Sequence, residues 1–144
     1  MALVYFDTSA LVKLLLNEPG TPLVAELWDR SDVLLASRLA YPEVRAALSA
    51  AARNHEIDED YLDEAEKAWD EYWASIRPVE LTEAIGRHAG TLTRLHALKG
   101  ADAVHLASAL AVNEADLVMA VWDRRLHAGA RAAGAAVAPA ELEG

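Results

Sequence analysis

The chain has no cysteine among its 144 residues. It therefore cannot form a disulfide, and it has neither a thiolate metal ligand nor a cysteine nucleophile. No apolar run approaches the roughly 18 residues that a membrane-spanning helix needs, and the first residues lack the basic segment of a secretory signal peptide. These absences predict a cytoplasmic protein that does not enter a membrane.

Positive charge is also scarce, with 13 Lys and Arg against 23 Asp and Glu and a net charge of −10. The excess is local, because residues 56–71 hold nine acidic residues and one lysine, which leaves a net charge of −2 elsewhere. Apolar residues such as Leu62, Ala65 and Trp69 recur among these acids at helical spacing, which indicates a helix with a solvated acidic face. Net charge therefore neither supports nor excludes a nucleic-acid partner.

Short apolar segments alternate with longer amphipathic ones along the chain. Strands are expected at residues 3–6, 33–36, 77–81, 117–122 and 135–138. Helices are expected at residues 9–16, from residue 21, and at 42–53, 59–75, 82–97, 102–112 and 124–133. This alternation predicts an α/β fold, a three-layer sandwich with a central, mostly parallel sheet of four to five strands flanked by helices. The length suits one domain, residues 1–140, followed by a tail at residues 141–144.

Two of the most apolar predicted strands end in a carboxylate, Asp7 and Asp123. Ligands bind at the carboxyl ends of parallel strands, and two unpaired carboxylates at one sheet edge repel each other and favour a cation. Oxygen ligands of this kind select magnesium or manganese over zinc. Either Asp can instead serve only as the N-cap of the helix that follows it.

Two further acids are predicted to lie at the same edge. Glu43 falls in the first turn of its helix, where the helix dipole also favours it for purely structural reasons. Asp102 opens the apolar segment Ala-Asp-Ala-Val-His-Leu-Ala, where a carboxylate is costly unless something compensates it, although a capping role is possible. Each acid alone is weak support for a site, but all four converge on one edge.

The order of these motifs resembles that of the PIN-domain ribonucleases, and among them the VapC toxins of bacterial toxin–antitoxin pairs. The segments that carry the resemblance are Phe-Asp-Thr-Ser-Ala at residues 6–10, Tyr-Pro-Glu-Val-Arg-Ala-Ala-Leu at 41–48, Asp-Ala-Val-His-Leu-Ala at 102–107 and Trp-Asp-Arg-Arg-Leu at 122–126. The match spans essentially the whole chain, and Asp-Ala-x-His-Leu-Ala is its most specific piece.

The resemblance implies a metal-dependent endoribonuclease that cuts single-stranded RNA and acts as the toxin of a type II toxin–antitoxin system. It implies a partner antitoxin of the VapB type, a homodimer, and a site that binds Mg²⁺ or Mn²⁺ through Asp7, Glu43, Asp102 and Asp123. In such a site Thr8 and Ser9 would supply hydroxyl or backbone N–H groups to the phosphate or to Asp7. Arg124 and Arg125, directly after Asp123, are candidates for contacting RNA phosphates.

One position departs from the family pattern, because Val121 stands where the family often has Thr or Ser. The departure leaves open a catalytically degenerate PIN fold that only binds a partner. A phosphatase with Asp7 as covalent nucleophile is the other alternative, although that chemistry needs a second Asp at the position of Ser9. His105 lies three residues after Asp102 and could bind metal, but among apolar neighbours we expect it to pack and form a hydrogen bond.

Overall fold

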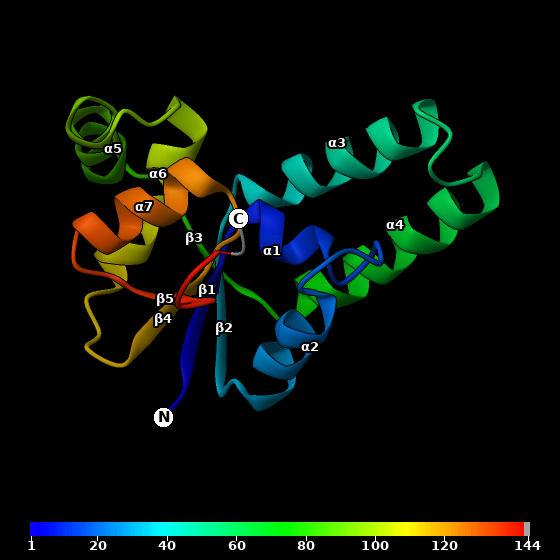
Figure 1. Ribbon diagram of the computed structural model, residues 1–144, viewed down its shortest axis with the longest axis horizontal. Helices are drawn as coiled ribbons and strands as arrows, with labels where there is room; N and C mark the ends of the chain where they lie inside the picture. The colour runs from blue at the N-terminus through cyan, green and yellow to red at the C-terminus, as the bar shows by residue number, and fades with distance from the viewer. Residues whose placement is uncertain (143–144) are drawn as a thin grey trace.

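Every strand of the central sheet runs parallel to its neighbours, in the order β3-β2-β1-β4-β5 (Figure 1). The strands are β1 (Leu3–Phe6), β2 (Val33–Ser37), β3 (Arg77–Val79), β4 (Leu117–Ala120) and β5 (Ala136–Ala138). The computed structural model describes residues 1–142. Within them, the expected three-layer α/β fold with a parallel sheet is confirmed.

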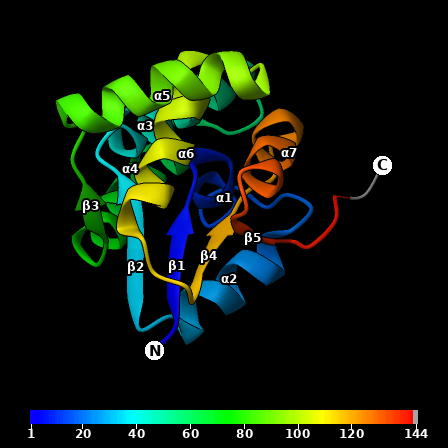
Figure 2. The ribbon, with the colours of Figure 1, turned by 90° about the vertical axis from the view of Figure 1, so that its left-hand side faces the viewer.

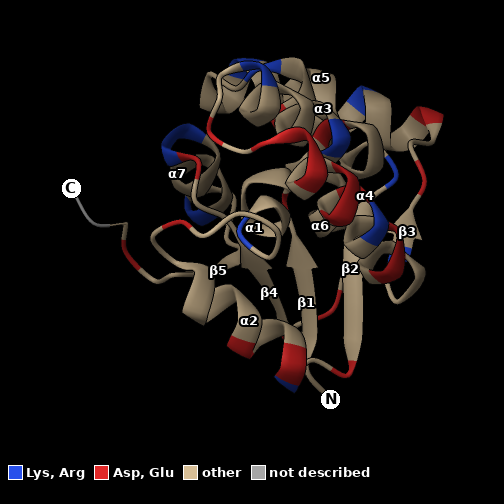
Figure 3. Cartoon of the chain, turned by 90° about the vertical axis from the view of Figure 1, so that its right-hand side faces the viewer, with Lys and Arg blue, Asp and Glu red and all other residues tan. Residues whose placement is uncertain are grey.

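Helices cover both faces of this sheet (Figure 1). One layer contains α1 (Thr8–Val12), α2 (Thr21–Arg30), α3 (Ala40–Arg53) and α4 (Glu59–Ala74). The other contains α5 (Glu83–His96), α6 (Gly100–Val112) and α7 (Arg124–Ala132). Acidic residues line α4 (Figure 3), as the sequence predicts, while Ala65 and Trp69 on its inner face are buried.

The core is divided by the sheet into two clusters, because successive side chains of a strand point to opposite faces. In β1, Val4 and Phe6 pack with α1–α4, whereas Tyr5 packs with α5–α7. All three side chains are buried. Burial on both faces explains why β1 is continuously apolar rather than alternating, and it makes β1 the rigid support for whatever follows it.

Several elements are shorter than the sequence suggests. The helix expected at residues 9–16 ends at Val12, after which Lys13, Leu14 and Leu15 form tighter turns in which each N–H bonds the carbonyl three residues earlier. Beyond the end of this helix, the Thr21 hydroxyl donates to the carbonyl oxygens of Lys13 and Leu16.

The third strand stops at Val79, and Pro78 is tolerated within it because β3 lies at the edge of the sheet.

The chain order of the strands places a topological switch at β1. From β1 the chain builds β2 and β3 on one side and then crosses to β4 and β5 on the other. The carboxyl ends of β1 and β4 point in the same direction beneath α6 and α7 (Figure 2). In open α/β sheets, ligands bind at such a switch point.

Among the described residues, no helix has the length and apolar character needed to cross a membrane. The tail expected at residues 141–144 falls partly outside the described residues.

Candidate active site

Four carboxylates reach the switch-point edge from four separate elements. Asp7 directly follows β1 and caps α1, and Asp123 lies beyond β4 and caps α7. Glu43 and Asp102 lie in the first turns of α3 and α6. Asp7 and Asp123 therefore both serve as N-caps, the structural role that the sequence gives as the alternative to a metal site.

Asp7 is the buried centre of this group, with 2% of its surface exposed. Oδ1 accepts hydrogen bonds from the backbone N–H of Ala10 at 2.9 Å and from the Ser9 hydroxyl at 2.7 Å. Burial, with a smaller effect from the charge of Asp123, raises the pKa of Asp7 to about 6 despite these hydrogen bonds. A carboxylate that is costly to ionise in the absence of a cation is one that a cation would stabilise.

Two hydrogen bonds hold the Glu43 carboxylate through its Oε1 atom. The Thr8 hydroxyl donates to Oε1 at 2.7 Å, and Nε2 of His105 lies 2.6 Å from the same oxygen. Burial acts to raise the pKa of Glu43, but the hydrogen bonds from His105 and Thr8 outweigh it and lower the pKa overall. Glu43 is therefore ionised more readily than an ordinary glutamate.

Asp102 and Asp123 complete the group. Burial raises the pKa of Asp102, and the negative charges of Asp123 and Glu43 raise it further. Within the described residues, none of Asp7, Asp102 and Asp123 forms an ion pair with a lysine or arginine. Among the described residues, the charges of His105 and Lys99 act to lower the pKa of Asp102 but do not outweigh the effects that raise it.

The donor set fits magnesium or manganese in chemistry, since all four groups are carboxylates. Over residues 1–142, however, no three acidic or histidine side chains are grouped as a ready-made cage for one ion. The carboxylates instead influence one another in pairs, Asp7 with Asp123 and Asp102 with Asp123 and Glu43. Magnesium sites of phosphoryl-transfer enzymes have this character, because one or two carboxylates bind the ion and water and phosphate complete its shell.

The other residues predicted for the site lie beside the carboxylates in the sequence, but they differ in what they contact. The Ser9 hydroxyl contacts Asp7, one of the two contacts foreseen for it, while Thr8 contacts Glu43 instead. Arg124 and Arg125 are exposed on the first turn of α7, next to Asp123.

Val121, the departure from the family pattern, is fully buried in the α5–α7 core, so it serves packing rather than the site.

His105 and Tyr5, which lie outside the predicted set of site residues, connect to the site. His105 is 2% exposed and forms the expected hydrogen bond, but its partner is the site residue Glu43, and its Nδ1 contacts the Tyr5 hydroxyl at 3.0 Å. The available signal in the sequence was Tyr5 itself, because a tyrosine in a fully buried strand needs a partner for its hydroxyl.

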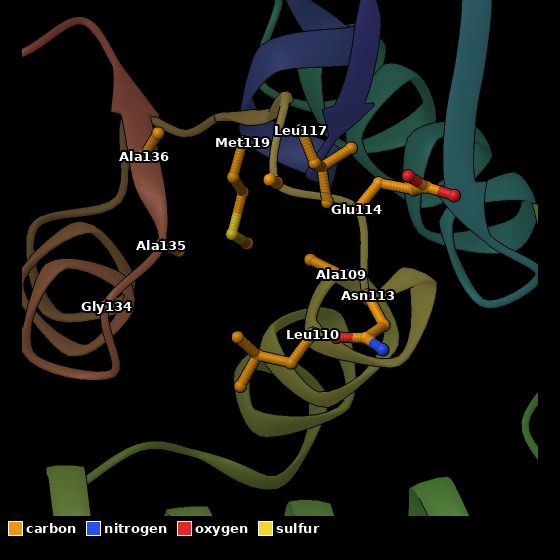
Figure 4. Close-up of a pocket in the computed structure, with 10 residues that line it drawn as sticks. Ala109, Leu110, Asn113, Glu114, Leu117, Met119, Gly134, Ala135 and Ala136 are labelled. Atoms are coloured by element: carbon orange, nitrogen blue, oxygen red, sulfur yellow. The ribbon is translucent and has the colours of Figure 1, made fainter.

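A separate pocket of about 370 Å³ lies at the opposite end of β4 (Figure 4). Met119 and Leu110 extend into it, whereas the carboxylate of Glu114 points away. No group of polar side chains converges there, so the pocket does not compete with the carboxylate edge as a reaction site.

The chain is similar to known proteins both in sequence and in fold. The sequence matches the PIN domain family model over residues 4–130. Ribonuclease VapC45 of Mycobacterium tuberculosis (strain CDC 1551 / Oshkosh) and Ribonuclease VapC49 of Mycobacterium tuberculosis (strain ATCC 25618 / H37Rv) are each 64% identical to it over 143 residues, which cover 99% of both chains. A solved toxin-antitoxin complex from Klebsiella pneumoniae shares the fold, with a TM-score of 0.68 at 18% identity over 97% of this chain and 99% of that one.

Proposed function

Because the chain belongs to the PIN-domain family, we propose that it is an endoribonuclease that requires Mg²⁺ or Mn²⁺ and cuts single-stranded RNA. Relatives that share 64% of its residues over nearly the whole chain are named as ribonucleases, which supports the reaction class. The observation that carries the proposal is the group of four carboxylates at the switch point, Asp7, Glu43, Asp102 and Asp123, none of which pairs with a lysine or arginine among the described residues.

In this proposal the four carboxylates hold the metal ions. A divalent ion bound there would lower the pKa of a water molecule and offset the negative charge that develops on the phosphate. The Ser9 hydroxyl and the Ala10 N–H hold Asp7, and the Thr8 hydroxyl holds Glu43.

On the substrate side, Arg124 and Arg125 would contact the phosphates that flank the cleaved bond. Their guanidinium groups match phosphate geometry and carry a fixed positive charge. Their position at the start of α7, directly after Asp123, supports this role.

We further propose that the ribonuclease acts as a cytoplasmic toxin, held inactive by an antitoxin of the VapB type and forming a homodimer. The fold it shares with a protein of a Klebsiella pneumoniae toxin-antitoxin complex supports a protein partner. The antitoxin would cover the carboxylate edge and thereby exclude RNA.

The arrangement of Asp7 disfavours a phosphatase that uses this residue as nucleophile. That chemistry needs a second Asp two residues after the nucleophile, and the residue there is Ser9, whose hydroxyl instead contacts both oxygens of Asp7.

The test is cleavage of labelled single-stranded RNA by the purified full chain, with Mg²⁺ or Mn²⁺ and then with a chelator. We expect cleavage that requires the metal, is lost in Asp7→Asn and is kept in Asp116→Asn, whose exposed carboxylate precedes β4 at the far end of the sheet. Absence of both cleavage and metal binding in the wild type would leave only a binding module with this fold. Cleavage that persists in Asp7→Asn and in Asp102→Asn would identify a contaminating nuclease.

A further inference from the structure

A buried chain of hydrogen bonds runs from the sheet to the carboxylate edge. The backbone N–H of Ser37 donates to the Tyr5 hydroxyl at 3.1 Å, and that hydroxyl lies 3.0 Å from Nδ1 of His105. Nε2 of His105 in turn lies 2.6 Å from Oε1 of Glu43. Tyr5 and His105 are almost fully buried, so bulk water does not substitute for these partners.

The position of the imidazole proton follows from counting donors and acceptors. The Tyr5 hydroxyl already accepts a hydrogen bond from Ser37, so its single proton needs an acceptor. A tyrosine hydroxyl is protonated at neutral pH, so this proton is present to be donated. Ser108 also acts on the Tyr5 hydroxyl, since it lowers the pKa of Tyr5 as a donor would, but its buried Oγ lies outside hydrogen-bond geometry with every described residue. The acceptor is therefore Nδ1 of His105, which must be unprotonated.

The consequence at Glu43 is an asymmetric carboxylate. With Nδ1 unprotonated, the neutral imidazole carries its proton on Nε2 and donates it to Oε1. The Thr8 hydroxyl donates to the same oxygen. Within the described residues, Oε2 accepts no hydrogen bond, so one oxygen is fixed by the protein and the other remains available to a ligand.

We propose that His105 is a positioning residue, which the Tyr5 hydroxyl fixes as the Nε2–H tautomer so that it holds Oε1 of Glu43 and leaves Oε2 to bind a divalent cation. The inference rests on the proposed function for the metal-binding role of Glu43. The tautomer itself depends on the contacts of the His105 ring with Tyr5, with Glu43 and with the Thr8 hydroxyl, which lies 3.3 Å from Nε2. Partners of this kind orient metal ligands from behind and set their basicity.

The first experiment reads the tautomer directly, by ¹⁵N NMR of the imidazole nitrogens in the metal-free full chain. The His105 signals are assigned as those missing from His105→Gln. We expect a protonated Nε2 and an unprotonated Nδ1 in the wild type, a change of this pattern in Tyr5→Phe, and no change in Ser108→Ala. A protonated Nδ1 in the wild type, or a pattern that Tyr5→Phe leaves unaltered, would overturn the proposal.

The second experiment measures Mn²⁺ affinity by calorimetry. His105→Leu should weaken binding roughly 10–100-fold, whereas His105→Gln, whose amide N–H can still reach Oε1, should recover most of the loss. His127→Gln is the matched control, because His127 is also buried but bonds the carbonyl of Pro139 instead. Equal affinities for the Leu variant and the wild type, or no recovery with Gln, would refute the positioning role.

The two experiments separate this inference from the proposed function. If the wild type neither binds Mn²⁺ nor cleaves RNA, the proposed function fails, and the role of His105 toward a cation fails with it. If the wild type binds Mn²⁺ and cleaves RNA but has the other tautomer, only the inference about His105 fails. The NMR measurement on the wild type and Tyr5→Phe also decides the matter if His105→Leu does not fold.

Discussion

The Ser9 hydroxyl lies 2.7 Å from Oδ1 and 2.8 Å from Oδ2 of Asp7, so one side chain contacts both oxygens of a buried carboxylate. The same hydroxyl accepts the backbone N–H of Trp122 at 3.1 Å. Ser9 therefore joins the first turn of α1 to the segment after β4, and it connects the two strand ends from which Asp7 and Asp123 extend.

Replacing Ser9 with alanine should destabilise the protein. In Ser9→Ala the N–H of Trp122 loses its partner and the buried Asp7 loses its side-chain donor, which should cost about 1–3 kcal/mol in the free energy of unfolding. The pKa of Asp7 should rise further, because the Ser9 hydrogen bond is the main influence that lowers it. Urea unfolding near neutral pH measures the loss. The exposed Ser75 gives the control Ser75→Ala, which should change stability by less than about 0.5 kcal/mol, and equal stabilities for the two variants would contradict the expectation.

Asp7→Asn should stabilise the metal-free protein at neutral pH while abolishing cleavage. Asp7 has a native pKa of about 6 against an ordinary value of 3.8, so the native state binds the proton more tightly than the unfolded state. The contribution of Asp7 to stability therefore decreases as the pH rises from about 4 to about 6, by about 3 kcal/mol in all.

The neutral Asn removes this pH-dependent loss. The variant should be more stable than the wild type by about 1–3 kcal/mol at neutral pH, and the difference should vanish below about pH 4. Urea unfolding of both proteins across this pH range, in the presence of a chelator, tests the sign of the stability difference between them. Parallel stability curves for the two proteins would show that ionised Asp7 is not a source of destabilisation.

The sheet could be predicted because its signal is local. The apolar run ending at Phe6 needs no knowledge of its neighbours, and its length matches β1. Strand ends are less accessible, because they depend on tertiary pairing. Trp122 continues the apolar pattern of β4, but the strand ends at Ala120, and beyond it the N–H of Val121 still bonds the carbonyl of Ala138.

The site could be predicted only in part, for the same reason. Asp7 and Asp123 are evident because each follows an apolar strand, and parallel strands bring their carboxyl ends together. The contact between His105 and Glu43 joins residues 62 positions apart. Nothing in either local sequence specifies that distance, because the hydrogen bond depends on how the tertiary fold brings α6 and the start of α3 to one edge of the sheet.

Divalent metal should stabilise the native protein through the carboxylate edge. An ion that binds the native state alone adds about 2.7 kcal/mol at a hundred times its dissociation constant. Mn²⁺ should therefore raise the melting temperature of the wild type, and a chelator should reverse the rise. Asp123→Asn should lose most of this effect, while Asp116→Asn should keep it. An equal Mn²⁺ shift in both variants would place the ion elsewhere.

Two glycines should respond to alanine with opposite signs. Gly20 has a φ of 96°, and an added Cβ would lie 2.7 Å from Nε1 of Trp122, so Gly20→Ala should cost about 1–3 kcal/mol in the free energy of unfolding. Gly90 lies within α5 with nothing within 4 Å of an added Cβ. Gly90→Ala should therefore add about 0.5–1 kcal/mol. Thermal and urea unfolding of both variants test the pair, and the same sign for both would contradict the assigned environments.

Arg125 provides a test of which surface the RNA occupies. If its guanidinium contacts a phosphate, Arg125→Gln should weaken binding of single-stranded RNA and reduce the slope of log affinity against log salt by about 0.7, because one fewer counterion is released. Binding is measured by fluorescence anisotropy in an Asp102→Asn background, so that the RNA stays intact.

The control is Arg30→Gln, since Arg30 ends α2 before β2, at the amino-terminal end of the strands, where it pairs with Glu26. A change in the salt slope for Arg125 but not for Arg30 supports a path for the RNA across the start of α7. Weaker binding with an unchanged slope would mean that Arg125 shapes the edge without contacting a phosphate, and the RNA would then have to approach the carboxylates from the side of α3 and α6.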